Sequence, residues 1–232
     1  MEVMSKIAIA FSHGGIWMWP ILTLQLASFA IVIERFYALY GKRKTNQVAL
    51  AKGFEESIRR GEMDQLIQKA ESLSTENAVA RATLAGAKAA KHLGGKEEVQ
   101  GKMDEVLMHE NSVIDRRTGF LTMVGNVSTL MGLLGTITGM IKSFASVAYA
   151  APAEKATLLA AGISEAMNCT AYGLIVAIPA LICYAILQNR ANMINEDLNQ
   201  AALKVFNWLS YSYEPIGFKS FKKGDASREA NA

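Results

Sequence analysis

Three polar side chains lie inside long apolar stretches, where they could help to move a cation across a membrane. Glu165 is the only charged residue of stretch 156–189, and Thr170 follows it five positions later. Thr136 belongs to stretch 118–141, which has no charged residue. A carboxylate can bind and release a proton, and a hydroxyl can donate and accept hydrogen bonds without becoming charged. Because an ionisable group at membrane depth is costly, it is a functional-site hypothesis by default.

Stretch 118–141 carries a polar and small-residue face. Its threonines recur every seven residues, and an asparagine and two glycines fall between or beyond them at steps of three and four, which puts them on one broad face of a helix. This face comprises Thr122, Asn126, Thr129, Gly132, Thr136, Gly139 and the following Ser143. The opposite positions are Leu, Met, Val and Ile. The pattern predicts a helix with lipid on one side and a polar or closely packed partner on the other.

Stretch 156–189 has a matching stripe of small residues, formed by Gly162, Ala166, Thr170, Gly173, Ala177 and Ala180. Small residues at such steps let two membrane helices approach closely. We therefore expect a helix-packing role for Gly132, Gly135, Gly139 and Gly173. A membrane threonine often bonds to its own helix or joins neighbouring helices, so this alternative stays open for each threonine taken alone.

A short turn at 150–156 makes the two stretches antiparallel neighbours. Thr136 and Thr170 each lie about fourteen residues from this turn, or roughly 21 Å at 1.5 Å per residue, and so lie at similar depth. The same count puts Glu165 level with Lys142, and we hypothesise that the two charges pair, because burying either alone is costly. Lys142 could instead extend to the membrane surface. Glu165 could relay protons or serve only as a structural ion-pair partner.

The composition excludes several classes of function. Of 232 residues, 19% are charged and 51% are hydrophobic, and the net charge of +3 is not gathered into a surface for nucleic acid. Cys169 and Cys183 lie about 21 Å apart along a helix and cannot form a disulfide. The sequence has no metal-ligand cluster, nucleotide-binding motif or nucleophile elbow. We expect no metal, no cofactor other than the transported proton, and no enzymatic activity.

The alternation of apolar and charged blocks predicts an all-α membrane protein with three transmembrane helices and long cytoplasmic helical extensions. Within the charged segment, helical periodicity marks 64–73, 78–91 and 96–115. The expected order is a periplasmic or interfacial helix (1–11), a first transmembrane helix (12–39), a cytoplasmic helical domain (40–117), a second transmembrane helix (118–149), a periplasmic turn (150–156), a third transmembrane helix (157–190), a cytoplasmic helix (191–213) and a flexible tail (214–232).

Basic residues next to the apolar stretches predict the topology. By the positive-inside rule, the ends of the spans that carry Arg or Lys lie in the cytoplasm. The deciding residues are Arg35, Lys42, Arg116, Arg117 and Arg190. The N-terminus is then periplasmic and the C-terminus cytoplasmic.

Two motifs carry a resemblance to a known family. GLLGTITGMIKSF, residues 132–144, and GISEAMNCTAYGLIVAIPA, residues 162–180, resemble the signature of the MotA/TolQ/ExbB proton-channel family. The ExbB and TolQ branch is the closer match. The resemblance is detailed over the two paired helices. Over the rest of the chain it extends to the order of the apolar and charged segments.

The resemblance implies a function and a set of partners. In such proteins the residues matching Thr136, Glu165 and Thr170 line the pore, and we place Thr129 and Asn126 on the same proton path. The family assembles in the bacterial inner membrane as a ring of five copies around two copies of a single-span ExbD- or TolR-like partner, whose membrane Asp carries the proton. Proton flow then drives an envelope machine for nutrient import, Tol-like maintenance or gliding. No Asp occurs in 12–39, 118–149 or 157–190, which fits this division of labour.

A second hypothesis is a non-conducting membrane scaffold, whose polar stripes only pack helices. The sequence also departs from the family pattern. Thr138 stands where relatives often have a bulky residue, and Asn168 and Cys169 stand where small apolar residues are usual. Both differences would make the interior more polar.

Overall fold

The computed structural model describes residues 15–41, 47–92 and 95–213, and these ranges are helical with no strand. The chain divides into two compact units. The first comprises Met1–Lys42 and Asp115–Ala191, and the second comprises Arg43–Ile114 and Asn192–Ala232. We call them the spanning unit and the charged unit. The expected helix at 1–11 and the expected tail at 214–232 lie outside the described residues.

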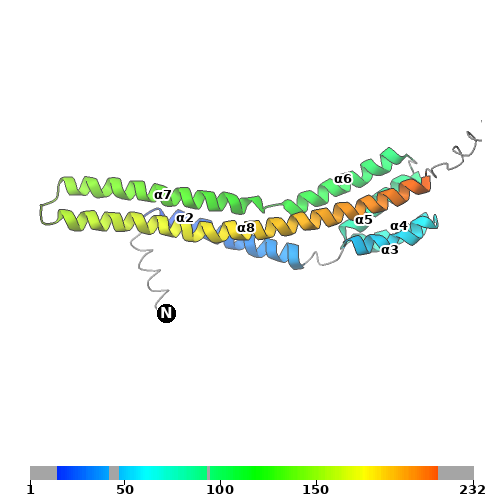
Figure 1. Ribbon diagram of the computed structural model, residues 1–232, viewed down its shortest axis with the longest axis horizontal. Helices are drawn as coiled ribbons and strands as arrows, with labels where there is room; N and C mark the ends of the chain where they lie inside the picture. Colours follow the sequence, from blue (N-terminus) through cyan, green and yellow to red (C-terminus); the bar gives the residue numbers. More distant parts are fainter. Residues whose placement is uncertain (1–14, 42–46, 93–94, 214–232) are drawn as a thin grey trace, which may run out of the picture. The chain divides into compact units, whose positions relative to one another are not determined.

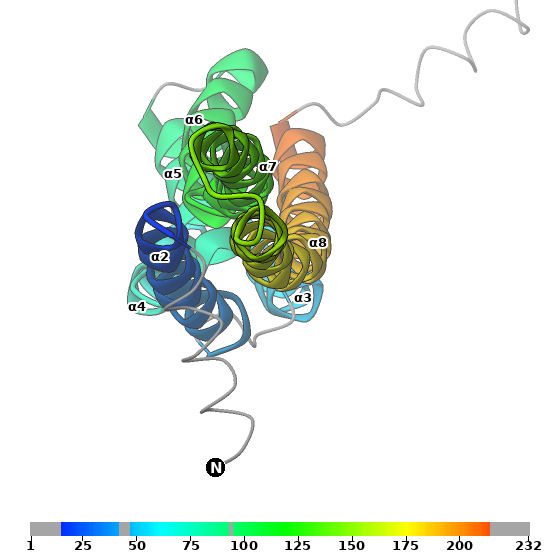
Figure 2. The same cartoon turned by 90° about the vertical axis from the view of Figure 1, so that its left-hand side faces the viewer.

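Three helices form the spanning unit. They are α2 (Met18–Phe36), extended by the π-helical turn η1 (Tyr37–Gly41), then α7 (Gly119–Ala148), and the first part of α8 (Lys155–Tyr213). A short turn joins α7 to α8, which run antiparallel side by side (Figure 1). Seen along their length, α2 lies beside this pair (Figure 2). The all-α fold with three helices long and apolar enough to cross a membrane confirms the predicted fold class.

Large apolar side chains cover the outside of the spanning unit. Leu26, Phe29, Ile33, Leu130, Leu133, Ile137, Ile141, Ile175, Ile178 and Ile182 are all exposed. A soluble monomer rarely exposes so much contiguous apolar surface. Lipid or other subunits therefore cover this surface, as expected of a membrane protein.

Glycines bring α7 and α8 into close contact. A methyl group added at Gly173 would lie 2.7 Å from the carbonyl oxygen of Ser128, and one at Gly139 would lie 3.1 Å from the Cβ atom of Ala166. A larger side chain at these positions would push the two helices apart. The close packing explains why both stretches carry small residues at steps of three and four.

The ends of the spanning helices follow from local chemistry. Pro20 lies in the first turn of α2, where its missing N–H costs no helical hydrogen bond. Arg117 has a φ of 64° and separates α7 from the preceding helix. Pro179 lies inside α8 without ending it. The 59 residues of α8 therefore run without a break from the range expected in the membrane into the range expected in the cytoplasm.

The charged unit is a bundle of α3 (Gln47–Arg59), α4 (Met63–Ser74), α5 (Ala78–His92), α6 (Lys96–Asp115) and the last part of α8. The alanine-rich α5 is the most buried of its helices. A Cβ atom at Gly86 would lie 2.8 Å from Met103 Cγ and 3.3 Å from Leu209 Cδ1, so α5, α6 and α8 pack closely here. The sequence analysis did not single out α3.

Arg81 links three helices of the charged unit through an ion pair and a hydrogen bond. Arg81 Nε and Nη2 donate to the two carboxylate oxygens of Glu110 over 2.8 and 2.9 Å. Arg81 Nη1 also donates to the carbonyl oxygen of Ser74 over 2.7 Å. The Glu110 side chain is only 6% exposed. This two-pronged geometry links the end of α4 to α5 and α6.

Candidate ion pathway

Thr170 joins the two central helices. Its hydroxyl donates a hydrogen bond of 2.9 Å to the carbonyl oxygen of Gly132. The bond can form because Gly132 has no side chain, and a Cβ atom there would lie 3.2 Å from the Cα atom of Thr170. The hydroxyl proton is therefore engaged within the helix pair. The oxygen keeps lone pairs with which it can accept a hydrogen bond from another group.

Thr136 lies on a different side of α7. Its hydroxyl donates to the carbonyl oxygen of Leu133, in its own helix, over 2.6 Å. It borders a shallow, mainly apolar hollow with Ile137, Met140, Ile141 and Phe144. Thr136 and Thr170 thus do not meet within one copy of the chain. Both hydroxyl groups nevertheless bond to backbone carbonyls and leave their oxygens as acceptors.

Thr129 and Asn126 follow the side of α7 that carries Thr136. Thr129 donates to the carbonyl oxygen of Gly125 over 3.1 Å, and both Thr129 and Asn126 are exposed. The small residues of α7 are buried instead, namely Gly125, Ser128, Gly132, Gly135, Gly139 and Ser143. The single broad face expected from the sequence is therefore divided in two. The small residues pack against α8, and the polar side chains of Asn126, Thr129 and Thr136 lie beside that contact.

Glu165 and Lys142 form an ion pair between α8 and α7. The Nζ atom of Lys142 lies 3.5 Å from Glu165 Oε2, so the two residues are near in level, as the residue count predicts. The Lys142 side chain is 72% exposed and that of Glu165 is 31% exposed. Gly15, which has a φ of 75°, lies directly against the Glu165 carboxylate. The pair borders a hollow of about 540 Å³ whose other lining includes Ser143, Ser146 and Ser164.

Tyr172 connects α8 to α2 through a contact that the sequence analysis missed. Its hydroxyl donates to Oε1 of Gln25. The tyrosine ring packs against the buried cluster formed by Met18, Ile21, Cys169 and Val176. The sequence offered one signal for this contact, the amide of Gln25 inside the first apolar stretch. Its partner, 147 residues away, could not be read from it.

Charged residues also link the ends of the spanning helices. Arg117 Nη1 lies 2.5 Å from Oε1 of Glu34, which joins the start of α7 to the end of α2. The guanidinium group of Arg190 lies over the ring of Tyr40, 5.3 Å from its centre. Arg117 and Arg190 are two of the basic residues that the positive-inside argument assigned to the cytoplasmic side of the membrane.

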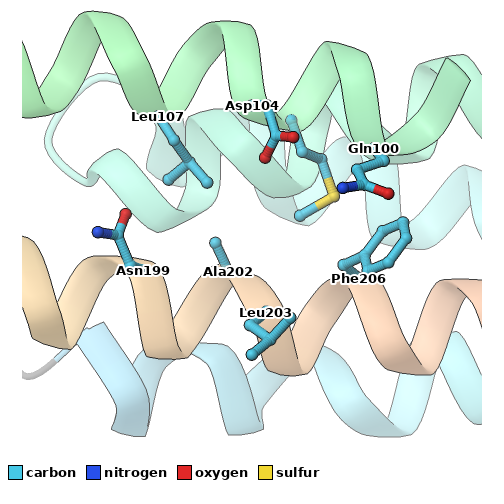
Figure 3. A pocket seen from close by; sticks show the side chains of 8 residues that line it. Gln100, Asp104, Leu107, Asn199, Ala202, Leu203 and Phe206 are labelled. Carbon is cyan, nitrogen blue, oxygen red and sulfur yellow. The ribbon is translucent and has the colours of Figure 1, made fainter. Parts of the chain in front are cut away.

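In the described part of the chain, the predicted pathway residues form no metal site and do not line the groove of the charged unit. Within 15–41, 47–92 and 95–213, no three His, Cys, Asp or Glu side chains form a group that could hold a metal ion. A groove of about 310 Å³ lies in the charged unit between α6 and α8. Its labelled lining includes Asp104 and Leu107 facing Asn199, Ala202 and Phe206 (Figure 3). Nothing in the sequence analysis predicted this groove.

The fold and the polar residues of its paired helices define an all-helical membrane protein with a candidate ion pathway. Residues 71–200 match the MotA/TolQ/ExbB proton channel family, which is more than half of the chain. The chain belongs to this family, and the resemblance found in its motifs is confirmed. It is therefore a membrane subunit of a proton-channel complex that transduces energy, in a family of transport proteins rather than of enzymes.

Individual relatives agree with this assignment. The Tol-Pal system protein TolQ of Haemophilus influenzae is 31% identical over 196 residues, which are 76% of this chain and 80% of the relative. The biopolymer transport protein ExbB of Salmonella typhimurium is 31% identical over 112 residues, or 48% of this chain and 46% of the relative. The TolQ of Pseudomonas aeruginosa is 38% identical over 98 residues, or 42% of each chain. These relatives confirm the ExbB and TolQ branch.

Proposed function

We propose that this chain is the ring subunit of a motor in the bacterial inner membrane that is driven by the proton-motive force. Five copies surround two copies of a single-span ExbD- or TolR-like partner. Protons cross the membrane between ring and partner, and the resulting movement does mechanical work on an envelope machine. Nutrient import, Tol-like envelope maintenance and gliding are the machines to which such work could pass.

The observation that carries this proposal is the orientation of the two pathway hydroxyls. Thr170 and Thr136 both direct their hydroxyl protons to backbone carbonyls, of Gly132 and Leu133. Each therefore offers an oxygen acceptor and no free proton donor. Such acceptors favour a neutral carboxylic acid or a hydrated proton over a carboxylate anion. A ring face of this kind would hold the partner's Asp better when it is protonated.

This preference supports a coupling mechanism. Protonation of the partner's Asp removes its charge and lets it lie against the threonine oxygens. Loss of the proton restores the charge, which then binds better where water or a cation is near. A cycle of proton uptake and release thus changes which part of the ring the partner prefers. Thr129 and Asn126 extend the same polar side of α7 along the path.

The exposed polar side of α7 supports an oligomer. In a single copy Asn126 and Thr129 are exposed on a helix whose neighbouring surface is apolar. Polar side chains are unfavourable against lipid tails. Several copies arranged around an axis would turn this side away from lipid and toward a shared interior.

The charged contacts support the proposed topology. Glu34, Arg117 and Arg190 flank the apolar stretches and would lie at the cytoplasmic surface. The Lys142–Glu165 pair lies toward the opposite ends of α7 and α8, near the turn that connects them. This pair would then lie near the periplasmic entrance, where protons arrive.

The test is proton uptake into liposomes under an imposed membrane potential. The full chain is reconstituted with and without its single-span partner and compared with Thr170→Val. We expect uptake to require both chains and to be lost in the variant. Thr23→Val is the matched control, because Thr23 is an exposed threonine of α2 that bonds to its own helix at Pro20. Normal uptake by Thr170→Val and Thr136→Val, together with loss of assembly in bulky variants of Gly135, would favour the scaffold.

A further inference from the structure

The hollow beside Glu165 has the chemistry of a cation site. A carboxylate lines it together with the hydroxyl groups of Ser143, Ser146 and Ser164. Ser143 donates to the carbonyl oxygen of Leu159 over 3.4 Å, and Ser146 donates to that of Lys142 over 2.9 Å. These two hydroxyls therefore keep their lone pairs for an incoming ion. Hard cations such as sodium bind sets of carboxylate, hydroxyl and carbonyl oxygens.

A cation is already present in this hollow, and it belongs to the chain. The ammonium group of Lys142 lies 3.5 Å from the Glu165 carboxylate and lines the same hollow. We propose that Lys142 occupies the position in which a sodium ion would bind Glu165, and so makes the pathway selective for protons. The proposal rests on the proposed function, because it concerns the ion that drives the motor.

The tethered ammonium excludes sodium by competition. A group held on the same chain has a high effective concentration at its partner, which a free ion must exceed. A sodium ion that entered beside Lys142 would also place two positive charges around one carboxylate. The repulsion between these two positive charges adds to the cost of binding sodium.

A proton is not excluded in the same way. It forms a covalent bond to a Glu165 oxygen, whereas sodium needs several oxygens at once and loses its water to reach them. Once Glu165 is neutral, the Lys142 side chain, which is 72% exposed, can move into water with its charge. Lys142 therefore competes with both the proton and sodium for Glu165. It prevents only sodium from binding, because sodium forms no covalent bond to the carboxylate.

Carbodiimide labelling of Glu165 tests this selectivity without requiring ion flux. A hydrophobic carbodiimide reacts with a protonated carboxyl group, so a bound sodium ion, which displaces the proton, slows the reaction. The full chain is labelled in sodium chloride or in choline chloride, and modified Glu165 is quantified by mass spectrometry. In Lys142→Met we expect sodium to slow labelling about threefold at a concentration twice its dissociation constant, whereas the unaltered chain shows no difference between the salts.

Three further variants separate charge from structure. Lys142→Arg keeps the positive charge and should remain insensitive to sodium. Lys155→Met removes an exposed lysine at the start of α8 and should behave as the unaltered chain. Lys142→Gln provides the same test where the methionine variant does not assemble. Labelling that is insensitive to sodium in Lys142→Met and Lys142→Gln, or equally sensitive in the unaltered chain, would overturn the proposal.

A flux measurement then separates this proposal from the proposed function. Liposomes that hold both chains are assayed for proton and sodium uptake. Proton uptake without sodium uptake in the unaltered pair, with sodium uptake gained in Lys142→Met, supports both. Absence of all uptake in the unaltered pair would contradict the proposed function while the labelling result still decides the role of Lys142. Sodium uptake by the unaltered pair would overturn the selectivity and leave a cation-driven motor.

Discussion

The hydroxyl of Thr170 donates a 2.9 Å hydrogen bond across the helix pair to the carbonyl oxygen of Gly132. The missing side chain of Gly132 and the small residues around it make this approach between helices possible. The position of the Thr170 hydroxyl in the candidate pathway therefore depends on the close packing of α7 against α8. A substitution that separates α7 from α8 will also move the Thr170 oxygen on which the proposed pathway depends.

Gly135→Ala should destabilise the spanning unit. The added methyl group would lie directly against Cys169 Sγ and 2.8 Å from Cys169 Cβ, so the helices must move apart. Overpacking of this kind costs about 1–3 kcal/mol, which a thermal or denaturant unfolding measurement on the full chain in detergent detects. Gly101→Ala is the control, because an added Cβ on this α6 glycine meets no atom within 4 Å. That change should instead raise stability by about 0.5–1 kcal/mol.

Arg81→Ala should destabilise the charged unit strongly. It would leave the buried carboxylate of Glu110 without its two-pronged partner. Breaking a fully buried ion pair by removing one partner costs about 3–5 kcal/mol, and the cost here should lie below that range because the Arg81 side chain is 33% exposed. Hydrogen exchange of the α5 and α6 amides in the full chain measures the loss. Arg60→Ala breaks an exposed pair with Glu56 and should cost less than about 1 kcal/mol. Equal protection in both variants would show that the Arg81 contact contributes little.

Tyr172→Phe should loosen the contact between α8 and α2 without unfolding the chain. The change removes only the hydroxyl that donates to Gln25 and keeps the packed ring. Hydrogen bonds between membrane helices contribute about 0.6 kcal/mol on average. Tyr211→Phe, at an exposed position of α8, is the matched control. An unfolding midpoint identical in the two variants would mean that the bond adds nothing to stability.

Single cysteines should report the topology. In a Cys169→Ala and Cys183→Ala background, a cysteine at Ala151, in the exposed turn between α7 and α8, should react with a membrane-impermeant maleimide added from the periplasmic side. A cysteine at Gln100, on the exposed surface of α6, should react only after the inner membrane is opened. The reverse pattern would contradict the assignment based on positive charges.

The sequence predicted those features that depend on local spacing. The apolar lengths of α7 and α8, their small residues and the level of Lys142 with Glu165 all follow from helical periodicity and one short turn. The division of the α7 face could not be predicted in this way. Periodicity places Thr136 and Gly132 on one broad face of a helix, but it does not show which edge of that face the next helix contacts.

Contacts between residues that are far apart in the chain also could not be predicted from the sequence. Arg81 and Glu110 are 29 residues apart, and Gln25 and Tyr172 are 147 residues apart. No alternation or motif connects such pairs, because the packing of separate helices brings them together. The helix α3 is a different case, because its buried residues Ala51, Phe54 and Ile58 lie at steps of three and four. Helical periodicity could have found this helix, and the sequence analysis missed it.

The most direct test of the central claim compares Thr170→Ser with Thr170→Val in the two-chain liposome assay. Serine keeps the hydroxyl oxygen and valine keeps the shape without it. The account predicts that proton uptake persists in Thr170→Ser and is lost in Thr170→Val, while both variants assemble with the partner. Equal uptake by the two variants would contradict a pathway that depends on the oxygen of Thr170.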